Sequence, residues 1–274
     1  DTFMGNKMGV LGLCILVFFL IVAFIGPLVY EFDQQSYGAG DLMAPPTDGF
    51  PLGTDDMGRD ILGSLIYGAK ISLMIGIFAT LISVCIGTFI GISSGFAGGK
   101  TDIILMRFTD GFMVLPKLPL IMILAALLGS NIRNIIIVLG FTSWTGTARL
   151  VRSQTLSVKE RQFVERAISA GAGRGYIMLK HILPNVFPLV FSNTILVTAN
   201  AILTETTLSF LGLGDPLTPS WGQILRGAFV SGAVSLGAWW FFVPAGLCVI
   251  LLVLGFTFLG YSFDEILNPK LRRR

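Results

Sequence analysis

Residues 71–99 read ISLMIGIFATLISVCIGTFIGISSGFAGG, a run of 29 residues without a charged side chain. A helix crosses the hydrocarbon core of a bilayer with about 20 apolar residues, so this run predicts a membrane-spanning helix. The whole chain of 274 residues is 53% hydrophobic and 13% charged, about half the charged share of a soluble domain. Composition therefore indicates an integral membrane protein and excludes soluble, disordered, collagen-like and disulfide-stapled classes.

Further long apolar intervals predict an all-α membrane protein with six transmembrane helices. We expect them at residues 9–30, 71–95, 105–128, 133–150, 186–211 and 240–261. The first could instead be a signal peptide, but its apolar run is too long and no small-residue cleavage site follows Pro27. The expected divisions are 1–70 (first helix and outer loop), 71–261 (transmembrane domain) and 262–274 (C-terminal tail).

Basic residues set the expected orientation, because loops on the cytoplasmic side carry an excess of Lys and Arg. With both termini cytoplasmic, 14 of the 19 basic residues lie inside, including Arg272–Arg274, which we expect to meet lipid phosphates. The first outer loop, 31–70, holds seven acids and two bases. The expected location is therefore a membrane, with both termini on its cytoplasmic side.

Few residues suit metal or covalent chemistry. The three cysteines lie in apolar stretches, and His181 is the single histidine, so we expect neither a metal site nor a disulfide framework. Residues 94–101, SGFAGGKT, differ by one residue from a phosphate-binding loop. Because a membrane helix precedes them rather than a strand, we interpret them as a glycine-rich inner turn.

The inner loop, residues 151–185, is the most informative polar segment. It predicts two short amphipathic helices, with Phe163 and Ile168 on the apolar face of the first, separated by glycines that start at Gly171. Pro184 then suits the start of the next helix. Such a loop could fit a groove on a partner or lie on lipid headgroups, and the pattern alone favours neither.

The spacing Glu165-Arg166-Ala167, then Gly171, then Leu183-Pro184 resembles the "EAA" loop of ABC importer permeases. Two positions depart from that pattern: Arg166 replaces an alanine, and His181 replaces an isoleucine. The ending KHILPN at 180–185 is similar to the dipeptide, oligopeptide and nickel branch. The resemblance implies that these residues couple to an ATPase: Glu165, Arg166, Ala167, Gly171, Leu183 and Pro184.

Three more stretches resemble the same branch in the same order. They are LGTDDMGRDI at 52–61 with YGAKIS at 67–72, LSFLGLG at 208–214 with PSWG at 219–222, and DEILNPKL at 264–271. The chain is therefore similar to the second permease of a peptide-type importer. That resemblance implies a type I importer fold with one N-terminal helix and a five-helix core, located in a prokaryotic inner membrane.

The implied partners are a paired permease, two cytoplasmic ATPases, an extracytoplasmic binding protein and lipid, without nucleic acid. The chain itself would be non-catalytic and hold no cofactor, with ATP and Mg²⁺ on the ATPases. Peptide is the expected substrate, with nickel or another small solute as the alternative. A secondary transporter or channel is the rival class, but it predicts internal repeats and several intramembrane charges that the sequence lacks.

Glu205 is an acid within a predicted span, where a carboxyl group is costly and commonly functional. It could line the pathway in a polar stripe with Asn193, Thr198 and Asn200, or bond structurally to a neighbouring helix. The two alternatives stay open.

The stretch 53–56, GTDD, predicts a helix start capped by Thr54 or Asp55, and residues 61–66 an elbow helix lying flat on the outer surface. Arg59 and Asp60 could contact the binding protein, although local structure explains most of this segment.

Overall fold

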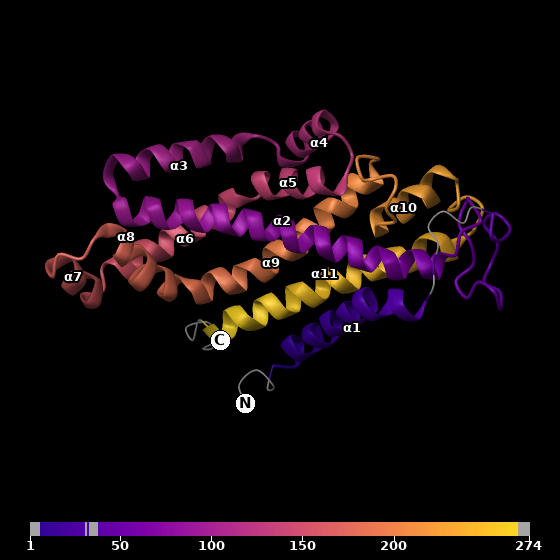
Figure 1. Ribbon diagram of the computed structural model, residues 1–274, viewed down its shortest axis with the longest axis horizontal. Coiled ribbons are helices and arrows are strands. Elements are labelled where there is room, and N and C mark those ends of the chain that lie inside the picture. Colours follow the sequence, from indigo (N-terminus) through magenta and orange to yellow (C-terminus); the bar gives the residue numbers. More distant parts are fainter. Residues whose placement is uncertain (1–5, 31, 33–37, 268–274) are drawn as a thin grey trace.

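The computed structural model describes residues 6–30, 32 and 38–267, and almost all of the described regular structure is helical. The helices are α1 (Lys7–Val29), α2 (Ile61–Ala97), α3 (Gly99–Val114), α4 (Lys117–Leu128), α5 (Ile132–Thr142), α6 (Trp144–Lys159), α7 (Gln162–Ser169), α8 (Arg174–Ile177), the π-helix η1 (Met178–Ile182), α9 (Leu183–Phe210), α10 (Trp221–Val230) and α11 (Trp239–Leu267). The long helices lie side by side along one axis, with α7 at one end and α10 at the other (Figure 1).

Four helical segments in the described residues are long and apolar enough to cross a membrane. They are Lys7–Val29, Ile61–Ala97, Arg174–Phe210 and Trp239–Ile266, and a fifth span results if α3 and α4 count as one broken crossing. These segments match the predicted spans at 9–30, 71–95, 186–211 and 240–261. The predicted number of six continuous spans is not confirmed.

The predicted span at 105–128 is broken, because α3 and α4 meet at an angle of 86°. Pro116 lies in the break, and Leu115 before it adopts the extended backbone (φ −69°, ψ 131°) that a following proline favours. The span expected at 133–150 is likewise divided at Ser143, between α5 and α6. Hydropathy detected both apolar stretches but not the breaks inside them.

The expected separate elbow helix is wrong, because residues 61–66 form the first turns of α2. Asp60, rather than Thr54 or Asp55, caps that helix: its carboxylate accepts hydrogen bonds from the backbone N–H groups of Leu62 and Gly63. At the other terminus α11 continues to Leu267, past the expected start of the tail at 262. The basic run Arg272–Arg274 lies outside the described residues.

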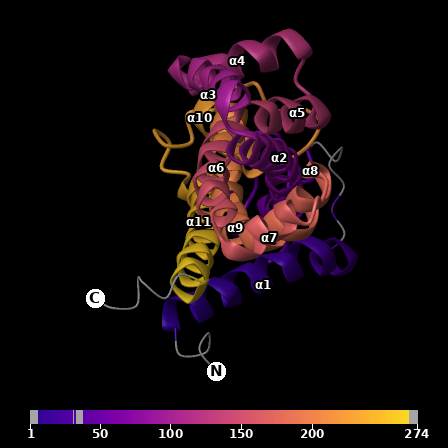
Figure 2. The ribbon, with the colours of Figure 1, turned by 90° about the vertical axis from the view of Figure 1, so that its left-hand side faces the viewer.

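Helix α2 is the centre of the molecule and contributes to all three apolar clusters. Its inner half packs closely on α6 along Gly87, Gly91 and Gly95: a Cβ added at Gly91 would lie 2.6 Å from the carbonyl oxygen of Ala148. Small residues of this kind let two membrane helices approach at backbone distance. Viewed from the α7 end, α6 and α9 lie next to α2, and α1 lies at the edge of the bundle (Figure 2).

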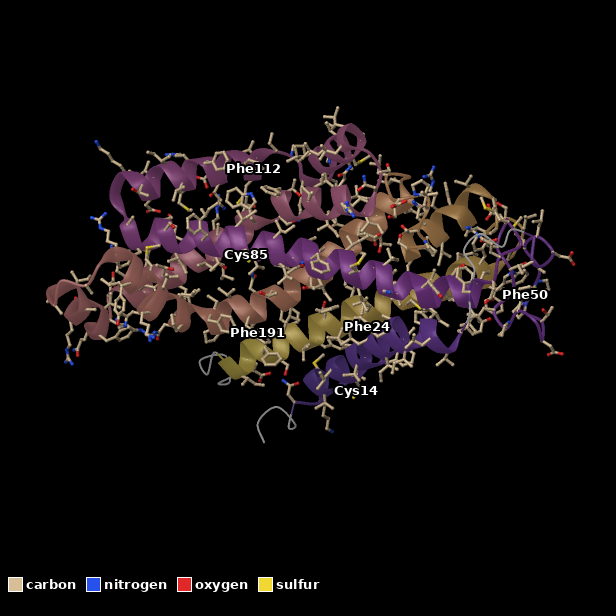
Figure 3. The ribbon with its side chains drawn as sticks, in the orientation of Figure 1. Cys14, Phe24, Phe50, Cys85, Phe112 and Phe191 are labelled. Atoms are coloured by element: carbon tan, nitrogen blue, oxygen red, sulfur yellow. The ribbon has the colours of Figure 1, made fainter. Side chains whose placement is uncertain are left out.

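Large apolar side chains cover the outside of the bundle. Phe24 is 66% exposed on α1, and Phe191 on α9 is 44% exposed; both are labelled in Figure 3. Cys14 and Cys85 are free thiols on the same apolar exterior. In water such a surface would be unstable, but it suits lipid and neighbouring membrane helices. The fold therefore presents its functional polar groups mainly at the two ends.

Candidate functional site

The inner loop forms a compact cap at one end of the bundle. Helix α7 ends at Ser169, and the chain reverses through Gly171, whose φ of +80° is one that glycine adopts without strain. The N–H of Gly171 donates to the carbonyl of Ile168 (2.9 Å), and the N–H of Ala172 donates to that of Ala167 (3.1 Å). These bonds satisfy carbonyl groups in the last turn of α7, so the reversal is a hydrogen-bonded helix C-terminus rather than an irregular loop.

The inward side of the loop packs into an apolar cluster that also contains side chains of α2, α6 and α9. Val164 and Ile182 are completely buried, and Ile177 is 1% exposed. They pack in the same cluster as Val151 and Val158 from α6. These three loop side chains therefore pack the loop closely against the adjoining ends of α2, α6 and α9.

The outward side of the same loop is exposed and mixes apolar, aromatic and charged groups. The ring of His181 lies 5.7 Å from that of Tyr176 and 6.1 Å from that of Phe163. The exposed large apolar side chains of the loop are Leu156, Phe163, Ile168, Tyr176 and Leu179. A shallow depression runs along α7 and is lined by Gln162, Glu165, Arg166 and Ser169.

The six residues expected to couple to an ATPase divide between these two sides. Glu165 and Arg166 lie on the exposed side, and Pro184 is exposed in the first turn of α9. Ala167 and Leu183 are half-buried and pack against the subunit's own apolar cluster. Ala167 therefore packs on helices of its own chain, while the exposed residues remain available to a partner.

Charged side chains join the helices next to the inner loop, α2, α3 and α6. Asp102 on α3 pairs with Arg152 on α6 at 2.6 Å and also accepts a hydrogen bond from Ser94. The ammonium group of Lys159 donates to the carbonyl of Phe96 at 2.7 Å. Residues 94–101, which resemble a phosphate-binding loop, form the end of α2 and the start of α3, as the inner-turn interpretation predicted.

The expected polar stripe on α9 separates into two faces. Asn193 is half-buried and Asn200 is exposed, whereas Thr198 is 5% exposed and Glu205 is fully buried. At about 100° per residue, Thr198 and Glu205 lie roughly 120–140° around the helix from Asn193. Glu205 therefore does not line an open pathway in this chain. The open face instead continues through two threonines that the sequence analysis did not single out, Thr204 and Thr207.

Glu205 lies between α9, α2 and the start of α10. Ser209 donates a hydrogen bond of 2.7 Å to its Oε1, and the hydroxyl groups of Ser72, Thr206 and Ser220 lie around the same carboxyl group. Its second oxygen, Oε2, has no partner of good hydrogen-bond geometry among the described residues. This geometry agrees with the structural alternative for Glu205.

The outer residues Arg59 and Asp60 are engaged in local structure. The guanidinium of Arg59 pairs with Asp55 at 2.7 Å, and Asp60 is 9% exposed where it caps α2. The hydroxyl of Tyr30 donates to Asp60 at 2.6 Å. Burial, together with this bond to a carboxylate, raises the pKa of Tyr30 to about 12. Contact with a binding protein is thus not the main role of Asp60 in this structure.

Residues 87–273, which include the inner loop and the spans packed around it, match the family model described as "Binding-protein-dependent transport system inner membrane component". The chain belongs to this family. Residues 1–46 match a second model, the N-terminal transmembrane domain of oligopeptide transport permease C. The family and the C-type permease inferred from the loop motifs are both confirmed.

Curated relatives agree over almost the full length. The chain is 41% identical to the oligopeptide transport system permease protein OppC of Haemophilus influenzae, covering 98% of this chain and 86% of the relative. It is 35% identical to OppC (99% and 88% covered) and 36% identical to the dipeptide permease DppC (98% and 83%), both of Bacillus subtilis. Among solved structures, the MetNI methionine ABC transporter in an inward-facing conformation matches with a TM-score of 0.60 at 17% identity, covering 74% of this chain and 94% of that chain. That match confirms the importer permease fold.

Proposed function

We propose that the chain forms half of the membrane pathway of an ATP-driven peptide importer and that its inner loop docks into a cytoplasmic ATPase. The observation that supports this most is the two-sided inner loop, anchored inward by Val164 and Ile177 and exposed outward at Phe163, Glu165 and Tyr176. A docking surface needs both properties, since it must be accessible and must transmit force. ATP and Mg²⁺ would be held by the ATPases, and this subunit would be non-catalytic.

The proposed orientation puts the inner loop and both termini in the cytoplasm. The side-chain amide of Asn6 donates to Glu265 at 2.9 Å, so the described ends of the chain lie together. Both lie toward the α7 side of the long axis (Figure 1). This grouping agrees with the positive bias of the loops that the sequence analysis assigned to the inside.

Peptides are the proposed substrate because relatives that match over almost the full length are named oligopeptide or dipeptide permeases. The proposed pathway surface is the open face of α9, formed by Asn193, Asn200, Thr204 and Thr207. Amide and hydroxyl groups suit a pathway for varied peptides, since they solvate backbone groups without selecting one side chain. A paired permease would supply the other half, and a binding protein would deliver the peptide.

The test compares two glycines of the inner loop, Gly171→Val and Gly173→Val, in the complete importer. Neither added Cβ meets an atom within 4 Å, but Gly171 has φ +80° and Gly173 has φ −65°. A Cβ therefore strains the turn only at Gly171, by about 1–2 kcal/mol. We expect Gly171→Val to lower ATP-dependent peptide uptake and its coupling to ATP hydrolysis about tenfold, and Gly173→Val to change either less than twofold.

Assembled complex is measured first, by co-purification of the ATPases, so that uptake is compared per complex. Equal uptake in both variants would contradict docking through the inner loop. Uptake of nickel but of no di- or oligopeptide by the unmodified importer would contradict the peptide assignment alone.

A further inference from the structure

Glu205 is a buried acid that the proposed mechanism does not use. Its carboxyl group is fully buried, and no Lys or Arg of the described residues forms an ion pair with it. The groups around it are hydroxyls from three separate elements: Ser72 on α2, Thr206 and Ser209 on α9, and Ser220 immediately before α10. A buried carboxyl group is costly unless it forms hydrogen bonds, so these hydroxyls stabilise its position.

The start of α10 is attached to the bundle at backbone distance. The indole N–H of Trp221 donates to the carbonyl of Leu65 on α2 at 3.0 Å, and the Trp221 side chain is completely buried. A Cβ added at Gly222 would lie 2.6 Å from the carbonyl oxygen of Thr206. The far end of α10 is open, with Phe229 67% exposed and Val230 72% exposed. Helix α10 is thus attached at backbone distance at the end next to Glu205, and farther along it packs on α11, where Ala228 is completely buried.

The helix that carries Glu205 begins in the inner loop. Helices α8, η1 and α9 form one span, Arg174–Phe210, without a sharp bend. Its first turns pack in the inner apolar cluster, and Glu205 lies near its outer end. Figure 1 shows this span running from beside α7 to α10. A displacement at the inner loop can therefore reach the outer end through a single rigid element.

We propose that Glu205 is a positioning residue that fixes the start of α10 to α9 and α2, so that α10 moves as one body with the span that begins in the inner loop. The outer end of the pathway would then change in step with the ATPases. Hydrogen bonds from hydroxyl groups, rather than charge, would supply the attachment. Ser209 on α9 already bonds to Oε1, and the unpartnered Oε2 would accept from the neighbouring hydroxyls of Ser72 on α2 or Ser220 before α10. This inference rests on the proposed function.

The experiment uses the complete importer in proteoliposomes with Glu205→Ala, Glu205→Gln and, as control, Thr257→Ala. The hydroxyl of Thr257 on α11 bonds only to the carbonyl of Val253 in its own helix. We expect Glu205→Ala to retain ATPase stimulation while uptake per ATP falls about tenfold. Glu205→Gln keeps the shape and an acceptor oxygen, so it and Thr257→Ala should stay within about twofold of the unmodified importer.

A distance measurement reads the attachment directly. Spin labels at Leu203 on α9 and Val230 on α10, both exposed, are introduced after Cys14, Cys85 and Cys248 have been replaced. We expect a narrow distance distribution in the unmodified protein and in Glu205→Gln, and a broadened one in Glu205→Ala. Unchanged uptake per ATP with a narrow distribution in Glu205→Ala would overturn the inference, and so would an equal defect in Glu205→Gln.

A milder variant covers the case in which Glu205→Ala does not assemble. Ser220→Ala removes the hydroxyl that lies beside the carboxyl group at the start of α10, and it leaves the Ser209 bond within α9 in place. It should lower uptake per ATP about threefold, and unchanged uptake would overturn the inference. If the unmodified importer shows no ATP-dependent uptake, the proposed function fails, whereas the spin-label distances still decide whether Glu205 holds α10.

Discussion

The two ends of the molecule use similar polar motifs in opposite ways. At the outer end, the carboxylate of Asp55 accepts from the backbone of Met57 and Arg59, and Asp60 caps α2. At the inner end, neither Glu165 nor Arg166 forms an ion pair within 4 Å in the part of the chain that the structure describes. A charged group satisfied within the chain maintains the fold, and one left exposed on a rigid element is available to a partner.

Two glycines make the same contrast in the backbone. Gly53 at the outer end has φ +74°, and Gly171 at the inner end has φ +80°. A Cβ at Gly53 would lie 2.4 Å from the carbonyl oxygen of Ala44, whereas a Cβ at Gly171 meets nothing within 4 Å. Substitution at the outer glycine therefore meets both strain and a clash, and at the inner glycine strain alone.

The largest expected effect is that of Gly53→Val on folding. Left-handed strain and the clash with a backbone oxygen together should lower the free energy of unfolding by about 3 kcal/mol. Thermal unfolding of the purified protein in detergent measures this. The control is Gly49→Val, where an added Cβ meets no atom within 4 Å. Equal stability of the two variants would show that the strain and the clash at Gly53 do not contribute to the stability of the outer end.

Asp60→Ala should have the next largest effect, about 2 kcal/mol of unfolding free energy, because α2 loses its cap and Tyr30 loses its acceptor. Asp48→Ala, at an exposed aspartate in the same outer loop, is the matched control. Uptake per folded importer should stay normal for Asp60→Ala. A loss of binding-protein affinity with unchanged stability would instead support the docking role considered for Asp60.

Hydropathy and motif spacing predicted four of the spans, the family and helix α7 of the inner loop. The second short helix expected in that loop is instead the start of the continuous span Arg174–Phe210. These patterns did not predict the break between α3 and α4, because apolar residues continue on both sides of Pro116 and hydropathy does not register a change of direction. They also placed Glu205 and Asn193 on one stripe. Around a helix these residues point to different faces, and which face is buried depends on the neighbouring helices α2 and α10.

The sequence indicated the inner loop as a whole, but not which of its side chains are exposed. The sequence identified Glu165 and Ala167 by their motif, yet only packing shows that Ala167 faces the subunit's own cluster. The aromatic group of Phe163, Tyr176 and His181 forms across the Gly171 reversal. Phe163 lies 13 positions before Tyr176 and 18 before His181, and such separations give no local periodic signal, so the group required the folded structure.

At the inner end, Glu165→Ala should change stability less than the two outer substitutions do. Its main effect should be on ATP-dependent peptide uptake. Because the carboxylate is exposed, unfolding free energy should change by less than about 0.5 kcal/mol. Peptide uptake should fall about tenfold, equivalent to about 1.4 kcal/mol of lost interaction with a partner. Glu160→Ala, an exposed acid just before α7, is the control for charge. Normal uptake by both variants would leave the inner motif without a demonstrated partner.

Tyr30→Phe should give the smallest change, because it removes one hydrogen bond at the outer end, worth about 1 kcal/mol, and leaves the Asp60 cap in place. Its signature is the pH dependence. The folded protein holds the phenol proton up to a pKa of about 12, whereas the unfolded chain loses it near 10, the ordinary value. The stabilisation is therefore complete below pH 10 and is lost as pH rises through 12. Phenolate absorbance should show one late-titrating tyrosine in the unmodified protein and none in Tyr30→Phe. If the titrations coincide, the contact between Tyr30 and Asp60 does not restrain the outer end.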